Sequence, residues 1–191
     1  MTTGITNRLA SLVLVIFLCF PAVSSAGSIS TFPDVKSMID AFNDYSTSNG
    51  TFVVLKSKPL HIQLSPQVVK GDLPEVIMEQ VNRALMYGIY RSFIHTQIKD
   101  ITVTAVPIEI NFRNKNSTLL SKYKKTISIS RNKALALVKK YINAASFSDL
   151  VTDAKIGTIV IHDQWTKDFK RIYYNDQGSP GLNRFVSELS K

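Results

Sequence analysis

Residues 73–95 constrain the fold of this chain more than any other stretch, because they predict one long helix. Asp72 is a candidate N-cap, Pro74 suits the first helical turn, and Glu75 takes the return position of a capping box. The first half of the segment has a polar and an apolar side, whereas the second half, LMYGIYRSFI, is apolar all round. A helix of that kind is usually buried, so we predict a long central helix whose C-terminal half is wrapped by other elements.

One stripe along this helix is polar at its start and becomes apolar in its second half, where it contains, at helical spacing, Met86, Tyr90 and Phe93. Two interpretations follow. If the three side chains are exposed, they form an apolar patch for a partner. If they are buried, they belong to the core, which is the usual place of methionine and aromatic stripes and the interpretation we favour.

Strands and further helices are predicted on both sides of this segment. The candidate strands are 51–56, 60–65, 101–112, 123–130 and 157–163. The candidate helices are 32–45, 131–145, 165–174 and 180–189. The first two strands predict a hairpin, and the change of alternation beside Pro107 predicts a bulge or an edge position. The fold class is therefore α+β, with an antiparallel sheet of about four to five strands packed with the long central helix (73–95) and further helices.

The first 26 residues have the pattern of a secretory signal peptide. Arg8 precedes an apolar run at 12–20, and Ser24 and Ala26 fit a small-residue cleavage site. The run is shorter than the about 20 residues of a membrane span, so we favour a cleaved signal over an uncleaved anchor. We expect residues 1–26 to be a signal peptide and 27–191 to be a single α+β domain without a transmembrane span.

Cysteine usage bears on the compartment. Cys19 is the only cysteine of the chain and lies inside the predicted signal peptide, so the mature chain is cysteine-free. An exported domain that forms no disulfide is typical of the bacterial periplasm. We therefore predict a periplasmic protein, with secretion from the cell as the alternative.

Positive charge is concentrated in residues 110–148, which contain nine Lys and Arg residues and no Asp or Glu. A face of the predicted strand and a face of the following helix could together form one basic surface. The residues concerned are Lys122, Lys124, Lys133, Lys139 and Lys140. Such a surface attracts anions and acidic partners, although charge runs of this size are often only solvated faces.

The start of the predicted helix 131–145 is a candidate anion site. Arg131 and Lys133 lie in its first turn, where the helix dipole disfavours cations. With Ser130 and the free backbone N–H groups of that turn, they could bind a carboxylate or a phosphate. The alternative is a slightly suboptimal helix start with no ligand.

His162 is the best candidate for catalysis, with Asp163 or Asp168 to orient it. Neighbouring residues of a strand point to opposite faces, so Asp163 more readily caps the helix that follows. No nucleophile motif such as G-x-S-x-G is present in the sequence. The three histidines do not pair at metal-ligand spacing, so we predict neither a metal site nor a cofactor.

These observations favour binding over catalysis. We expect a periplasmic, non-catalytic accessory, inhibitor or immunity-type protein whose basic face contacts an acidic partner protein. The alternative is a binder of an anionic envelope lipid or glycan, and a hydrolase-like enzyme centred on His162 is the third possibility. Nucleic acid is not expected as a partner, because the basic strand lacks the interleaved aromatics of a single-strand binder.

Overall fold

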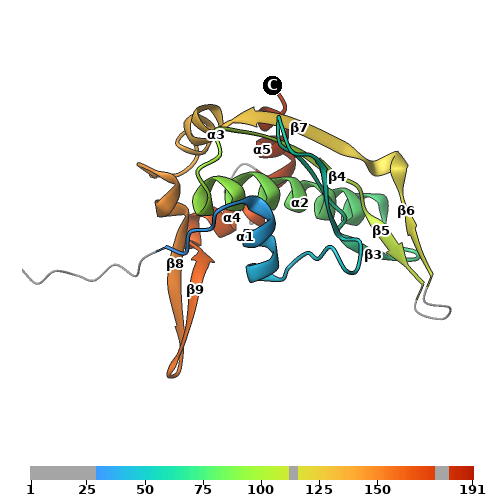
Figure 1. Ribbon diagram of the computed structural model, residues 1–191, viewed down its shortest axis with the longest axis horizontal. Coiled ribbons are helices and arrows are strands. Elements are labelled where there is room, and N and C mark those ends of the chain that lie inside the picture. The colour runs from blue at the N-terminus through green and yellow to red at the C-terminus, as the bar shows by residue number, and fades with distance from the viewer. Residues whose placement is uncertain (1–28, 112–115, 175–180) are drawn as a thin grey trace, which may run out of the picture.

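The computed structural model describes residues 29–111, 116–174 and 181–191, and shows a mixed α+β fold (Figure 1). The helices are α1 (Val35–Phe42), α2 (Pro74–His95), α3 (Arg131–Val138), α4 (Lys167–Tyr173) and α5 (Leu182–Leu189), with the 3-10 turns η1 (Ser121–Tyr123) and η2 (Phe147–Leu150). The strands are β1 (Phe52–Lys56), β2 (His61–Leu64), β3 (Gln67–Val69), β4 (Asp100–Ala105), β5 (Ile108–Ile110), β6 (Ser117–Leu119), β7 (Lys125–Ser130), β8 (Val151–Ile156) and β9 (Ile159–Trp165). The predicted signal peptide lies outside the described residues.

The main sheet has the strand order β1-β2-β4-β7. The predicted hairpin is confirmed, since β1 and β2 pair antiparallel with Phe52 opposite Leu64, and β4 also pairs antiparallel with β7. The prediction of an antiparallel sheet is wrong for the central pair, because β2 and β4 run parallel. The reason is that α2 stands between these two strands in the chain, and a crossover helix is the usual connection of a parallel pair.

A three-stranded sheet, β3-β5-β6, continues the main sheet beyond a break marked by two prolines. The backbone N–H of Ile108 donates to the Pro66 carbonyl at 2.9 Å, and that of Leu120 donates to the Pro107 carbonyl at 2.8 Å. The strand predicted over 101–112 is therefore divided at Pro107, which has no N–H to give to the ladder. Because β4 lies between β2 and β7, this break, and not an edge position, explains the change of alternation.

Helix α2 spans Pro74–His95, close to the prediction, but its N-terminus differs in detail. Leu73 is the N-cap residue and makes no side-chain cap, whereas the Asp72 carboxylate accepts a hydrogen bond from the Val69 N–H at 2.9 Å. The predicted Asp72 cap is wrong, because the carboxylate is taken by the turn that leads into the helix.

The C-terminal half of α2 is buried, as predicted. Met86, Tyr90 and Phe93 are fully buried, so they belong to the core and the apolar patch is not formed. The helix lies close against the sheet at Gly88, where a Cβ atom would stand 2.8 Å from Val103 Cγ1. Figure 1 shows α2 running beneath the main sheet, with the other helices on the same side.

The C-terminal third contains an element that the sequence did not predict. Strand β8 pairs antiparallel with β9, and this hairpin projects from the body of the molecule (Figure 1). Helix α3 ends at Val138, seven residues before its predicted end at 145. Within the part of the chain that the structure describes, no helix is long and apolar enough to cross a membrane.

Candidate functional site

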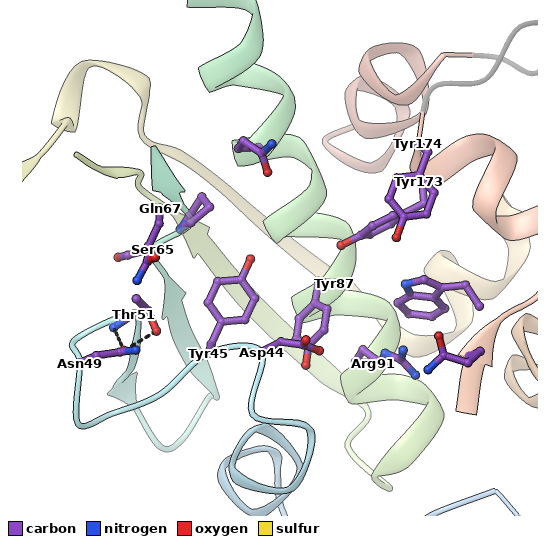
Figure 2. A pocket seen from close by; sticks show the side chains of 14 residues that line it. Asp44, Tyr45, Asn49, Thr51, Ser65, Gln67, Tyr87, Arg91, Tyr173 and Tyr174 are labelled. Carbon is purple, nitrogen blue, oxygen red and sulfur yellow. Dashed lines mark hydrogen bonds between the residues drawn. The ribbon is translucent and has the colours of Figure 1, made fainter. Parts of the chain in front are cut away.

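A cavity of about 450 Å³ opens between α2, the loop before β1, the bend between β2 and β3, the end of β9 and the C-terminal end of α4 (Figure 2). Five aromatic side chains and one guanidinium are its most distinctive lining groups. They are Tyr45, Tyr87, Arg91, Trp165, Tyr173 and Tyr174. Their positions in the sequence are far apart, so the fold alone brings these groups to one place.

Arg91 is the central charged group of this pocket, and its side chain is almost fully buried, with 5 % of its surface exposed. The guanidinium lies between two rings, 3.9 Å from the centroid of Trp165 and 4.6 Å from that of Phe42. Its Nη1 donates to the Asp163 carbonyl at 2.6 Å and lies 3.2 Å from His95 Nε2. Burial lowers the pKa of Arg91, yet arginine keeps its charge in proteins.

Two buried polar groups of the pocket wall lack hydrogen-bond partners. Arg91 Nε is one, and the hydroxyl of Tyr87, a residue only 4 % exposed, is the other. Burial raises the pKa of Tyr87, and the nearby Asp44 carboxylate raises it further. The distance and angle between the Tyr87 hydroxyl and Asp44 are nevertheless not those of a hydrogen bond. Among the described residues, no carboxylate forms an ion pair with Arg91. Unpaired buried groups are costly. Both atoms have almost no accessible surface, so a ligand would bond to them, and recover part of that cost, only after a small shift of the neighbouring side chains.

The tyrosines act as neutral hydrogen-bonding groups. Burial raises the pKa of Tyr45, Tyr87 and Tyr173, so their hydroxyls stay protonated at any physiological pH. Tyr174 is half exposed at the rim, where the Arg83 guanidinium lies 5.3 Å from its ring centroid. The pocket therefore offers hydroxyl donors and aromatic faces beside a single fixed cation.

His95 links the pocket to the N-terminal segment. Its Nδ1 lies 2.8 Å from the Ser30 carbonyl, which can only accept, so Nδ1 carries the proton and Nε2 accepts from Arg91. Burial lowers the pKa of His95, which agrees with a neutral ring. The Ser30 N–H also donates to the Asp163 carboxylate at 3.3 Å. These bonds hold the N-terminal segment and β9 against the end of α2.

The predicted catalytic pair is not formed. The His162 side chain is exposed and its Nδ1 lies 3.1 Å from an Asp153 carboxylate oxygen across the β8–β9 hairpin. Asp163 is buried on the other side of β9, with a φ of 55° beside a register shift. It does not cap α4 either, whose N-cap residue is Thr166. Asp163 instead supplies the carbonyl that holds Arg91.

The predicted basic surface is divided into two groups. Lys122 and Lys124 lie before the first residue of β7, whereas the other three lysines belong to α3 and its C-terminal end. Strand β7 has six residues, so the two groups are separated by about 20 Å at the rise of an extended chain. All five lysines are exposed, and Lys140 is near enough to Glu188 to contribute, after Tyr141 and Arg184, to the lowered pKa of that carboxyl.

The predicted anion site at the start of α3 is occupied by the protein itself. Arg131 Nη1 donates to the carbonyls of Thr96 and Ile98, at 3.1 and 3.2 Å, so its guanidinium faces the loop after α2. Ser130 caps the helix as predicted, and its hydroxyl accepts from the Lys133 N–H at 3.3 Å. The Arg131 N–H is used too, because it donates to the Lys99 carbonyl. Of the groups expected to hold an anion, the Arg131 guanidinium, the Ser130 hydroxyl and two backbone N–H groups are bonded within the fold, whereas the Lys133 side chain is exposed.

Sequence reasoning missed the pocket, although one signal for Arg91 was present. An arginine inside the apolar run GIYRSFI must be buried with the rest of that helix, and buried cations are rare unless they are paired or functional. The other lining residues, such as Tyr45, Trp165 and Tyr173, come from separate loops and elements, and no local pattern marks them. Among the described residues, no cluster of three His, Cys, Asp or Glu could hold a metal ion.

Comparison with protein-family models, with curated proteins and with solved structures found no match to this chain. The geometry of the pocket therefore carries the functional argument by itself.

Proposed function

We propose that this protein is a non-catalytic binding protein that holds a small anionic ligand in the pocket around Arg91. The observation that carries the proposal is a buried arginine that forms no ion pair among the described residues and whose Nε lacks a hydrogen bond. The Asp44 and Asp163 carboxylates lie near enough to favour its charge, but neither contacts the guanidinium directly. A guanidinium in a partly desolvated site binds carboxylate or phosphate groups strongly, because the bonds are charge-assisted and the planar geometry matches. Such a ligand corresponds to the alternative function predicted from the sequence, the binding of an anionic envelope lipid or glycan.

Binding is a better explanation of the pocket than catalysis. The buried tyrosines are held neutral, and the pocket contains one carboxylate, Asp44, which is exposed. A hydrolytic site needs a base within hydrogen-bond reach of a nucleophile or a water, with a group to orient it. His162, the candidate base, is not among the residues that line this cavity.

An acidic partner protein is the second candidate. The observation that favours it is the exposure of Lys133, Lys139 and Lys140 on α3 and its C-terminal end. A partner that also reached Lys122 and Lys124 would have to extend along the whole of β7, which a protein can do and a small ligand cannot.

Export to the periplasm remains part of the proposal, and sequencing the N-terminus of the protein from envelope extract tests it, since cleavage predicts a start at Gly27.

The single tryptophan of the chain makes the pocket easy to test. Trp165 lines the cavity and stacks on Arg91, so its fluorescence reports occupancy without a label. Titration with propionate, inorganic phosphate and D-glucuronate should change the emission saturably for at least one of them. In Arg91→Lys the affinity should fall by about tenfold or more, because one ammonium cannot reproduce the planar fork of a guanidinium.

Lys133→Gln is the matched control, since it removes one exposed cation and leaves the cavity intact. It should bind the same ligand with unchanged affinity. If Arg91→Lys folds normally and binds as tightly as the unmodified protein, or if Lys133→Gln loses binding instead, the pocket proposal is wrong and the basic face becomes the better candidate.

A further inference from the structure

The cavity has two chemically different ends. Arg91 and Tyr87, both from α2, form the end that carries the fixed positive charge. The opposite end is neutral and polar, and is built by Asn49, Thr51 and Gln67 from the segments around β1 and β3 (Figure 2). A ligand that fills the cavity must therefore present an acidic group to one end and neutral donors and acceptors to the other.

The neutral end is held in place by the fold. The Thr51 hydroxyl donates to Asn49 Oδ1 at 2.6 Å, and the Thr51 N–H donates to the same oxygen at 3.1 Å. The Ser65 side chain, also in the lining, is fully buried and lies 3.4 Å from Gln63 Nε2. The Thr51 hydroxyl and Asn49 Oδ1 are thus bonded within the fold, and Ser65 is buried, so the amides of the exposed Asn49 and Gln67 are the groups left at this end for the hydroxyls of a ligand.

Aromatic rings lie between the two ends. Tyr45 and Tyr87 stand side by side, with ring centroids 5.2 Å apart, and Tyr173 lies beyond them (Figure 2). Rings of this kind suit the flat, partly apolar C–H face of a pyranose, while the hydroxyls around its edge need amide, hydroxyl and carboxylate partners. A simple fatty acid would leave the amide end unpaired, and a neutral sugar would leave Arg91 unpaired.

We propose that the ligand is an acidic sugar, a pyranose that carries a carboxylate, bound with its carboxylate at Arg91 and its hydroxyls at the Asn49–Gln67 end. This inference rests on the proposed function and makes it more specific. The exposed Asp44 carboxylate, which lies beside Tyr87 (Figure 2), accepts from a ring hydroxyl next to the acidic group, and the Tyr87 hydroxyl donates to the sugar carboxylate. A cavity of about 450 Å³ accommodates one or two sugar rings.

Three probes separate the parts of this ligand in the tryptophan titration of the full protein. D-Glucuronate has both the ring and the carboxylate, D-glucose has the same ring without the charge, and propionate has the charge without the ring. D-Glucuronate should bind at least about tenfold more tightly than either of the others, a difference of about 1.4 kcal/mol. N-Acetylmuramate, a sugar that carries its carboxylate on a side arm, tests where along the ring the acid must lie.

The outcomes distinguish the inference from the function on which it rests. If propionate binds as tightly as D-glucuronate, the acidic-sugar inference is wrong and the anion pocket stands. If D-glucose binds as tightly as D-glucuronate, Arg91 is not the anchor and both fail. If none of these probes binds to the folded protein but inorganic phosphate does, the acidic-sugar inference is wrong and the anion pocket stands. If phosphate does not bind either, both fail.

A variant at the neutral end provides the second readout. Gln67 is exposed at the mouth of the cavity, so Gln67→Ala should leave folding unchanged. It should weaken D-glucuronate about threefold to tenfold, since one hydrogen bond to a ligand is typically worth about 1 kcal/mol, and leave propionate unchanged. Equal weakening of both probes would show that Gln67 acts on the pocket as a whole, and would overturn its assigned role in sugar recognition.

Discussion

The molecule carries its cations in two very different settings, inside at Arg91 and outside on the lysines of η1 and α3. The five exposed lysines are surrounded by water, which screens their fields and weakens any single contact. Arg91 is enclosed by Phe42, Trp165 and α2, where the same charge interacts far more strongly with anything placed beside it. Nine clustered charges in the sequence are thus less informative about a small-molecule site than one charge in an apolar helix.

The two settings also differ in what the charge does for the fold. Arg91 bonds to the Asp163 carbonyl and to His95, so it connects α2, β9 and the N-terminal segment. The exposed lysines make weaker contacts among the described residues: Lys122 lies 4.8 Å from the Tyr123 ring centroid, and Lys139 and Lys140 help to lower the pKa of Asp149 and of Glu188. Substitutions in the two settings should therefore give very different responses, and four predictions test this contrast.

The largest effect is expected for Arg91→Ala. The substitution removes two buried hydrogen bonds, leaves the Asp163 carbonyl unpaired and opens a cavity between Phe42 and Trp165. The free energy of unfolding should fall by about 3 kcal/mol. Urea denaturation measures the change, with the exposed Lys133→Ala as the matched control. A loss no larger than that of the control would contradict the connecting role of Arg91.

The second prediction concerns pH. Burial lowers the pKa of His95 in the folded protein. As the pH falls through the ordinary histidine range, His95 is therefore protonated in the unfolded chain but stays neutral in the folded protein. Stability should decline from about pH 7 downward, by at most about 1.4 kcal/mol per pH unit, and this contribution should level off below the lowered pKa. Denaturation at several pH values should show a smaller decline in His95→Gln than in His162→Gln, whose imidazole is exposed. An identical decline in the two variants would exclude His95 as the cause.

Tyr87→Phe should separate stability from binding. The hydroxyl is buried without a partner, so its removal should raise the free energy of unfolding by about 1 kcal/mol. The same change should weaken the anionic ligand, because it removes a donor from the charged end of the cavity. Thermal unfolding and the tryptophan titration measure the two effects. A variant that is less stable than the unmodified protein would show that the hydroxyl is bonded in the fold after all.

The smallest effect is expected for the triple variant in which Lys133, Lys139 and Lys140 are changed to Gln. Exposed charges on a helix end contribute little, so the free energy of unfolding should change by less than about 0.5 kcal/mol. Ligand affinity in the pocket should be unchanged. Capture of an acidic protein by the unmodified chain but not by this variant, in pull-downs from envelope extract, would establish the external surface as a second functional region.

The sequence alone predicted the elements whose signal is local. The β-branched content of 51–56 and the alternation of 60–65 identified the hairpin, and the apolar half of residues 73–95 identified a buried helix with Met86, Tyr90 and Phe93 in the core. Such patterns are reliable because side-chain periodicity within a single element decides which of its faces is buried. The α+β class followed from the order of these elements.

The tertiary structure decided everything that depends on contacts between distant segments. The parallel pairing of β2 with β4 required a crossover by α2, and strand β8 exists only because β9 pairs with it. Arg131, expected to bind an anion, bonds instead to carbonyls of the loop that follows α2. The pocket is the clearest case, since Tyr45, Arg91 and Trp165 are separated by dozens of residues. Periodicity reports which way a side chain faces from its own element, whereas the environment of a side chain is set by whatever the folded chain places opposite it.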